Sequence, residues 1–425
     1  MKKIWALLFA VFTAASAAAE TKLSFDALSR TRYEYHLNVF DAGFSGSDER
    51  SFFRFKFAAG LSADFDGIAS AYLRIANESR SYIYNAGGNT EYNINEFLID
   101  NLFFTVPGIL DVLEIKAGRM DFSPADYGEG FLLADGTPLD GSRTMYFNTV
   151  KAKFASEESS VELIGIYNPR VDDLMPIANE NMPDTALNDS NESAFIVYGR
   201  TGDKDKLYFE PYYMYKHEEA AQSGRRENEI NAFGSYVKYN LNDNVILRGQ
   251  AAMQLNDYYD KVNTAFGGYV FADLPLSNVV NPFSLGYVYL SGNDPKTAGA
   301  EGWNPLFSRY PWMSELVCYL YRNESGTAYW TNLQMVKADL NFDITKKMKI
   351  LLSGALLYAN ESYHGAAPMF GEGKNRGALS LAKISYAFSK NIGAYVLGEY
   401  FKPGDFYFGG AKDSVFIRAE LSAKL

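Results

Sequence analysis

The 425-residue sequence is poor in the groups that make cross-links and metal sites, with one cysteine, Cys318, and three histidines. A single cysteine excludes an intrachain disulfide, and so few thiols and imidazoles argue against zinc, so we expect no metal and no cofactor. Beyond residue 20 there is no apolar run long enough for a membrane helix. Linkers and composition shifts are missing too, which argues against several soluble domains. The net charge of −11 gives no basis for nucleic-acid binding.

The first residues have the features of an export signal. Lys2 and Lys3 precede an apolar stretch over 4–16, and the alanines at 17–19 fit a small-x-small cleavage site. We therefore predict a signal peptide at 1–19 and a mature chain over 20–425. A signal peptide without later helical spans indicates the periplasm, the outer membrane or secretion.

Aromatic residues are plentiful, with 31 Tyr and 31 Phe, and they alternate with polar residues. In one stretch Phe53, Phe55 and Phe57 share a face opposite Arg54 and Lys56. This period of two recurs through the chain, as in transmembrane β-barrels, which have an apolar lipid face and a polar lumen. The sequence thus predicts an all-β protein, a single transmembrane antiparallel β-barrel of the bacterial outer membrane over 20–425.

Short turns and longer polar segments follow each other in the order expected of such a barrel. The short turns are predicted at 64–67, 107–108, 157–158, 202–205, 242–244, 275–278, 345–346 and 389–391. The longer segments are predicted at 38–48, 80–92, 120–144, 169–192, 217–228, 256–263, 292–328, 360–374 and 402–413. These connections join about 18 strands and place both termini on the short-turn, periplasmic side. The strands near 193–200, 264–274 and 329–340 alternate too poorly for their faces to be assigned.

Tyrosine and phenylalanine gather near predicted strand ends, where aromatic rings suit the lipid headgroup level. We expect a girdle that includes these residues: Tyr33, Tyr35, Tyr212, Tyr213, Tyr215, Tyr258, Tyr259, Tyr287, Tyr289, Phe406, Tyr407 and Phe408.

Side chains alternate between the two faces of a strand, so odd- and even-numbered residues face opposite sides. The face that carries the charges is assigned to the lumen, because a charge on the lipid face costs about 2–4 kcal/mol at the membrane midplane. The basic members, a candidate substrate path, are Arg30, Arg32, Arg54, Lys56, Arg74, Lys151, Lys153, Arg248 and Arg418. The acidic members are Glu34, Glu96, Asp100 and Glu420. A positive wall favours anions; the alternative is that the mixed charges only balance each other.

Two long loops are candidates for narrowing the pore. One contains Gly128 and Gly130 between Arg119 and Arg143, and it predicts a constriction over 121–144. The other, over 292–328, carries aromatic residues that suit stacking on sugar rings: Trp303, Phe307, Tyr310 and Trp312. For each, an ordinary extracellular loop is the alternative.

Several short motifs occur in an order that resembles a known family. They are Arg30-x-Arg32-x-Glu34, Ala117-Gly118-Arg119 with Tyr127-Gly128-Glu129-Gly130, and Tyr289-Leu290-Ser291-Gly292-Asn293-Asp294 with Pro305-Leu306-Phe307. Together they resemble the alginate-export family of outer-membrane barrels. The resemblance implies a porin-like barrel whose lumenal arginines guide an acidic polysaccharide.

The leading hypothesis is therefore a channel, not an enzyme, for diffusion or export of small anions or an acidic polysaccharide such as alginate. A weakly selective nutrient-uptake porin is the alternative within the same class. A plugged structural or adhesin barrel and a lipid-modifying enzyme are the readings from other classes. The expected partners are outer-membrane lipid, the transported anion and the barrel-assembly machinery, and the sequence leaves the oligomeric state, transport direction and substrate open.

Overall fold

A computed structural model describes residues 21–425, except 47, 87–96, 110, 123–126, 131–146, 172–189, 222–226, 243, 259–260, 278, 295, 298, 309–310 and 364–367. The predicted signal peptide lies outside these residues. The described chain forms one closed antiparallel sheet of 18 strands, as predicted.

The first nine strands are β1 (Thr21–Leu37), β2 (Arg50–Phe65), β3 (Ala69–Asn85), β4 (Leu98–Ile109), β5 (Leu113–Met120), β6 (Phe147–Ala155), β7 (Ser160–Asn168), β8 (Glu192–Gly202) and β9 (Leu207–Glu218). The second nine are β10 (Asn228–Asn242), β11 (Val245–Tyr258), β12 (Lys261–Leu274), β13 (Val280–Leu290), β14 (Leu333–Asp343), β15 (Met348–Tyr358), β16 (Asn375–Ala387), β17 (Ile392–Pro403) and β18 (Ser414–Lys424). The described helices are short: η2 (Gly128–Gly130), α2 (Glu315–Leu320) and η3 (Tyr321–Asn323).

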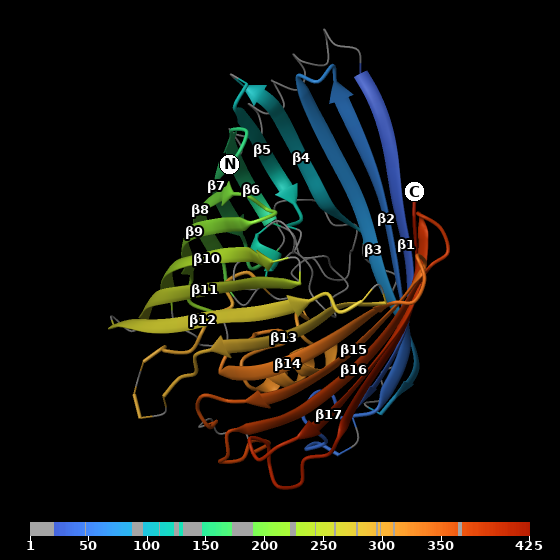
Figure 1. Cartoon of the computed structure of the whole chain (residues 1–425), viewed down its shortest axis with the longest axis vertical. Helices are drawn as coiled ribbons and strands as arrows, with labels where there is room; N and C mark the ends of the chain where they lie inside the picture. The colour runs from blue at the N-terminus through green and yellow to red at the C-terminus, as the bar shows by residue number, and fades with distance from the viewer. Residues whose placement is uncertain are drawn as a thin grey trace.

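Each strand pairs with its neighbours in chain order, and the ring is closed by β1, which pairs with both β2 and β18. The closing register runs from Leu28 opposite Lys424 to Leu37 opposite Val415. Figure 1 shows the blue first strands beside the red end of the chain. Closure leaves no strand edge, which is what a sheet in hydrocarbon requires, since lipid offers no partner for free backbone groups.

The alternation of short and long connections is the one predicted, with three local differences. β3 continues to Asn85, well into the loop predicted over 80–92. Pro107 and Gly108 lie inside β4, so the turn comes after Ile109. The predicted loop over 256–263 is mostly strand, because β11 continues to Tyr258 and β12 begins at Lys261. Both termini of the sheet lie at the short-turn end, which is the periplasmic end in bacterial barrels.

The two faces of the wall differ in exposure as the alternation predicts. In β2, Phe53, Phe55 and Phe57 are 37%, 36% and 52% exposed, whereas Arg54 and Lys56 are 2% and 8% exposed. Strands such as β12 alternate poorly for a physical reason. Tyr269 and Phe271 of β12 face inward and are buried, while Phe266 and Val270 on the same strand face outward. Apolar residues are needed on both faces here because the lumen is partly filled.

The aromatic girdle prediction fails at some positions. Tyr213 and Tyr215 lie on the outward face of β9, but Tyr212 is inward and 6% exposed. Phe406 and Tyr407 are buried in the connection between β17 and β18. Clustering in sequence did not separate residues at the headgroup level from residues that pack inside the barrel mouth.

The outer surface of the barrel carries a broad set of exposed apolar side chains, among them Phe195, Phe233, Leu352 and Val396. On a closed barrel of this size, such a surface is the lipid-facing band of an outer-membrane protein. The fold and this band place the chain in a bacterial outer membrane. Separately, none of the helices in the described ranges has the length and apolar character needed to cross a membrane.

A charge on the outward face should destabilise the barrel according to its depth. Val270→Arg, in the middle part of β12, should lower the free energy of unfolding by about 2–4 kcal/mol, and Val262→Arg, at the end of the same strand and face, by about 0–1 kcal/mol. Urea titration of both variants in lipid vesicles measures the difference. Equal costs would contradict the assignment of this face to lipid.

Candidate functional site: the barrel lumen

The connection between β13 and β14, residues 291–332, folds into the barrel and reaches opposite walls. On one side Lys216 of β9 donates to the carbonyl oxygen of Leu306 at 2.9 Å. On the other side Arg418 of β18 forms an ion pair with Glu315, the first residue of α2. Since β9 and β18 lie half-way round the barrel from each other, this segment, the lumen loop, crosses the bore.

The start of α2 is held by the wall through a carboxylate. Glu399 of β17 accepts hydrogen bonds from the backbone N–H groups of Glu315 and Leu316, both at 3.0 Å, and from the hydroxyl of Ser314. Ser314 itself caps the helix by accepting from the N–H of Val317 at 3.0 Å. A negative charge beside the free N–H groups of a helix N-terminus is favourable, so this contact fixes the helix against the wall.

The far end of the lumen loop has a second ionic anchor. Arg376 of β16 donates to both carboxylate oxygens of Glu324, at 2.8 and 2.6 Å, and to the carbonyl oxygen of Asn332 at 3.1 Å. Such a two-pronged contact is among the stronger and more directional ion pairs. The loop is therefore tied to β9, β16, β17 and β18.

The lumen loop also carries its own apolar core. Trp303 and Trp330 are 1% exposed, and Phe307 is 2% exposed with its ring 5.5 Å from that of Phe147 on β6. Gly267 of β12 makes room for Trp303, since a Cβ there would lie 2.6 Å from the indole ring. These rings pack against the wall, so the prediction that Trp303 and Phe307 stack on sugars is wrong.

Other residues of the same prediction have different outcomes. Trp312 is half-buried beside Tyr269, with ring centroids 6.0 Å apart, and Tyr310 lies outside the described residues.

The single cysteine, Cys318, is fully buried in α2, and burial raises the pKa of its thiol well above the usual value. A thiol in this state is a packing group.

Part of the predicted constriction, the segment around η2, also lies in the lumen. Glu129 accepts from Arg248 of β11 at 2.9 and 2.7 Å and from the hydroxyl of Tyr269 at 3.1 Å. Its φ of 64° is in the left-handed region, which is uncommon for a residue other than glycine. The strained backbone is held by the contacts of its carboxylate.

The neighbours of Glu129 attach the same segment to further strands. Gly128 donates its N–H to Glu210 of β9 at 2.8 Å, and the hydroxyl of Tyr127 accepts from Lys151 of β6 at 2.7 Å. Of the other predicted members, Arg119 is fully buried in the wall, where it donates to the carbonyl oxygen of Ile99 at 2.9 Å. Arg143 and most of 121–144 lie outside the described residues.

A mixed-charge wall occupies β1, β2, β3 and β18, which are adjacent because the barrel closes there. Its buried part centres on Glu34, which is 0% exposed and lies 2.8 Å from Arg418 and 3.4 Å from Arg54. Arg54 also pairs with Glu78. With both guanidiniums 2% exposed, their charges are offset by carboxylates and serve the wall's stability more than its potential.

The more accessible part of this wall lies nearer the periplasmic end. Arg32 and Glu420 form an ion pair whose side chains are 15% and 11% exposed. Arg30, 14% exposed, donates to Glu78 at 3.0 Å, and Lys56 lies 3.9 Å from the same carboxylate. Arg30, Arg32 and Glu420 are therefore partly exposed on the lumenal side, whereas Lys56 is buried.

The remaining predicted lumenal residues are distributed around the bore. Arg74 pairs with Asp100 through two contacts of 2.8 Å and also with Asp121. Lys153 lines a cavity of about 650 Å³ near the 156–159 turn. Glu96 lies outside the described residues. The structure thus joins the predicted cations of β1, β2 and β18 into one cluster. Arg74 borders it, because its partners Asp100 and Asp121 also act on Lys56, whereas Lys151, Lys153 and Arg248 stand apart.

Several lumenal charges were missed from the sequence. Arg200 of β8 donates to Glu162 at 2.6 Å, but the poor alternation of β8 left its face unassigned. Lys216 is fully buried between Glu192 and Glu218, at 2.8 and 2.7 Å. No sequence signal marks the loop residue Glu315, because side chains in a loop do not alternate between two faces as they do in a strand.

Removal of the carboxylate between the two buried guanidiniums should be costly. Glu34→Gln should lower the free energy of unfolding by about 3–5 kcal/mol, because it leaves Arg54 and Arg418 less compensated. Glu361→Gln, which breaks the more exposed pair with Lys374, should cost less than about 1 kcal/mol. Unfolding in urea, followed by tryptophan fluorescence, compares the two. A cost for Glu34→Gln as small as for the control would mean that the cluster does not hold the wall together.

No protein-family model matches the chain, and no curated protein sequence matches it significantly. Solved structures do match over almost the whole barrel. The outer membrane protein OprD of Pseudomonas aeruginosa is 12% identical with a TM-score of 0.58, covering 96% of this chain and 95% of its own. OpdK of the same organism, in its structure with vanillate, is 10% identical with a TM-score of 0.62, covering 95% and 98%. OpdO is 12% identical with a TM-score of 0.59, covering 95% and 97%.

These comparisons correct the assignment to the alginate-export family, which was wrong. The matched structures named above are OprD and OccK proteins, and no family model supports the motif resemblance. The short Gly-Arg and Ser-Gly motifs at strand ends therefore did not identify the family. What this chain shares with the matched structures is the 18-stranded outer-membrane barrel fold.

Proposed function

We propose that this chain is an uptake channel through which small water-soluble solutes, anionic ones by preference, diffuse across the outer membrane. The observation that carries the proposal is the lumen loop, which crosses the bore and is anchored on opposite walls by Lys216 and Arg418. A bore that is spanned in this way suits small solutes and opposes the passage of a polymer.

The partly exposed charges of the lumen wall also favour a channel over a sealed structural barrel. On the β1–β18 wall, the charged side chains of Arg30, Arg32 and Glu420 stay 11–15% exposed. A plug without a transport role has no need for partly exposed ion pairs along the wall, because an apolar filling would be at least as stable.

The matched structures support the same reading. OprD and OccK barrels are nutrient-uptake porins, and OpdK has been solved with vanillate, a small aromatic carboxylate. By this analogy in fold, the proposed solutes are small organic anions, and diffusion through the channel includes no catalytic step.

The charge pattern predicts weak selectivity. In the cluster on β1, β2, β3, β4, β16, β17 and β18 with its loop partners, the cations are Arg30, Arg32, Arg54, Lys56, Arg74, Lys383 and Arg418, and the carboxylates are Glu34, Glu78, Asp100, Asp121, Glu315, Glu399 and Glu420. The two kinds of charge are balanced in number, so selectivity is weak, and the proposed preference for anions rests mainly on the analogy with OpdK.

Shortening the lumen loop should open the pore. A variant in which residues 296–329 are replaced by a short Gly-Ser linker should have a single-channel conductance several times that of the parent in planar bilayers. In liposome-swelling assays the parent should admit small carboxylates and exclude an oligouronate of about ten sugars, and the variant should admit both.

The folded state of the variant is checked by its heat-dependent mobility in gels, since a closed barrel resists detergent until it is boiled. An unchanged conductance in a folded variant would show that the loop does not limit passage. Rapid entry of the oligouronate through the parent would return the function to polymer transport.

The exposed Arg32–Glu420 pair offers a matched test of selectivity. Arg32→Gln should shift the reversal potential in a salt gradient toward cations, and Glu420→Gln should shift it toward anions, because each removes one lumenal charge of opposite sign. Arg54→Gln should have a smaller effect, since Arg54 is only 2% exposed. Shifts in the same direction, or none, would mean that selectivity is set elsewhere.

A further inference from the structure

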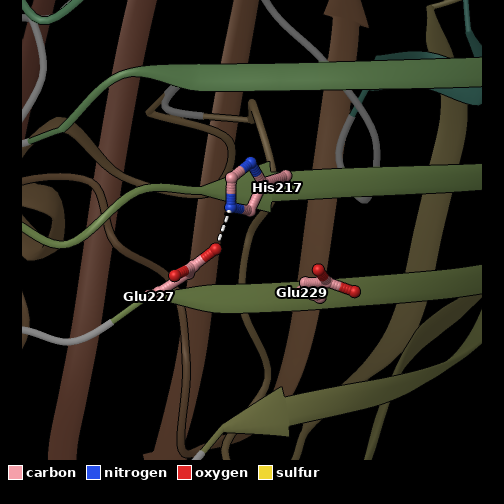
Figure 2. Close-up of side chains that lie close together, drawn as sticks. All are labelled: His217, Glu227 and Glu229. Atoms are coloured by element: carbon pink, nitrogen blue, oxygen red, sulfur yellow. Dashed lines mark hydrogen bonds and ion pairs between the residues drawn. The ribbon is translucent and has the colours of Figure 1, made fainter.

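We infer that the outer rim of the barrel carries a divalent transition-metal site formed by His217, Glu227 and Glu229. These residues lie at the ends of β9 and β10, as Figure 2 shows, with Glu227 turned toward the imidazole. One ligand atom from each of the three residues lies within 4.8 Å of the others. The site is distinct from the lumen, because all three residues are on the outside of the sheet or at its exposed edge.

The pairing register brings the three donors together. His217 lies directly opposite Glu229 in the antiparallel pair of β9 and β10. The return of the chain into β10 then places Glu227 next to the same imidazole, with its Oε1 2.6 Å from Nε2 of His217. Two ligands of one zinc ion are roughly 3.3 Å apart, given bonds of about 2.0–2.2 Å. Metal binding therefore needs the His217–Glu227 hydrogen bond to open by about 0.7 Å and the Glu229 carboxylate to move closer.

The neighbouring strand supplies an independent reason for a cation. Asp257 of β11 lies directly opposite Glu229 on the outward face, and both residues are exposed. Like charges directly opposite each other destabilise a sheet. Among the described residues no Lys or Arg is ion-paired with Glu227 or Glu229; Arg225 and Arg226, which precede Glu227, lie outside them. A bound dication at this position offsets the repulsion.

The surroundings also fit a bound ion. Below the site on the same outward face lie Tyr213 and Tyr215, and Tyr215 hydrogen-bonds to Glu229. A tyrosine that orients a metal-binding carboxylate is a common supporting contact. His217 is 26% exposed and Glu227 62% exposed at their side chains, so coordination positions remain open to water.

The donor set selects among metals. One imidazole nitrogen with carboxylate oxygens suits Zn²⁺ and similar first-row ions, whereas Ca²⁺ and Mg²⁺ prefer oxygen ligands alone. A histidine-poor sequence gave no hint of this site, because the nine residues between His217 and Glu227 follow no metal-binding spacing. The antiparallel pairing of β9 with β10, and not a motif, creates it.

The test is a Zn²⁺ titration by calorimetry of the folded, tag-free barrel in detergent micelles. The parent should bind one Zn²⁺ per chain, and His217→Ala and Glu229→Gln should each weaken binding by more than about tenfold, since loss of even a supporting partner of a metal ligand costs about 10–100-fold. The control Glu361→Gln, a carboxylate on another loop, should bind like the parent. Zn²⁺ should also raise the unfolding temperature of the parent and of the control but not of His217→Ala.

Three outcomes would overturn the inference. They are no saturable binding by the parent, parental affinity in folded His217→Ala and Glu229→Gln, and Ca²⁺ binding as tight as Zn²⁺ binding, which would leave the imidazole without a role. Gel mobility before and after heating confirms that each variant is a closed barrel.

Discussion

The structure depends on the closure of one hydrogen-bonded sheet. In a bilayer the backbone N–H and C=O groups have no water to bind, so the first strand must pair with the last. The β1–β18 register meets this requirement, and it brings together residues from the two ends of the chain. The ion pairs of Arg32 with Glu420 and of Glu34 with Arg418 exist only because of that closure.

Closure also explains why the interior is polar and yet well packed. A wall with its apolar face turned outward must turn its polar face inward, and isolated charges there are costly unless they are paired. Around Glu34 the pairing is internal to the wall, whereas Arg418 and Arg376 also take partners from the lumen loop, Glu315 and Glu324. The loop therefore fills the bore and compensates wall charges by the same contacts.

The sequence was sufficient for the barrel, the number of strands and the facing of strands that alternate cleanly, such as β2. Alternation reports lipid on one side and water on the other, and it fails where the inner face is also apolar, as at Tyr269 and Phe271 of β12. The site was less predictable. The alternation of faces placed Arg30 and Arg32 in the lumen, but it does not indicate which carboxylate of the lumen loop forms an ion pair with Arg418. The metal-binding set was missed because it depends on strand register, which a single sequence does not reveal.

The anchor between Glu315 and Arg418 has a consequence for the order of assembly. Arg418 belongs to the final strand, and Glu399, which holds the start of α2, belongs to the strand before it. A chain inserted strand by strand from its N-terminus therefore has neither contact available when the lumen loop itself is made. In such an order the part of the loop that contacts β9 can pack first, whereas α2 gains its wall contacts only after β17 and β18 are in place.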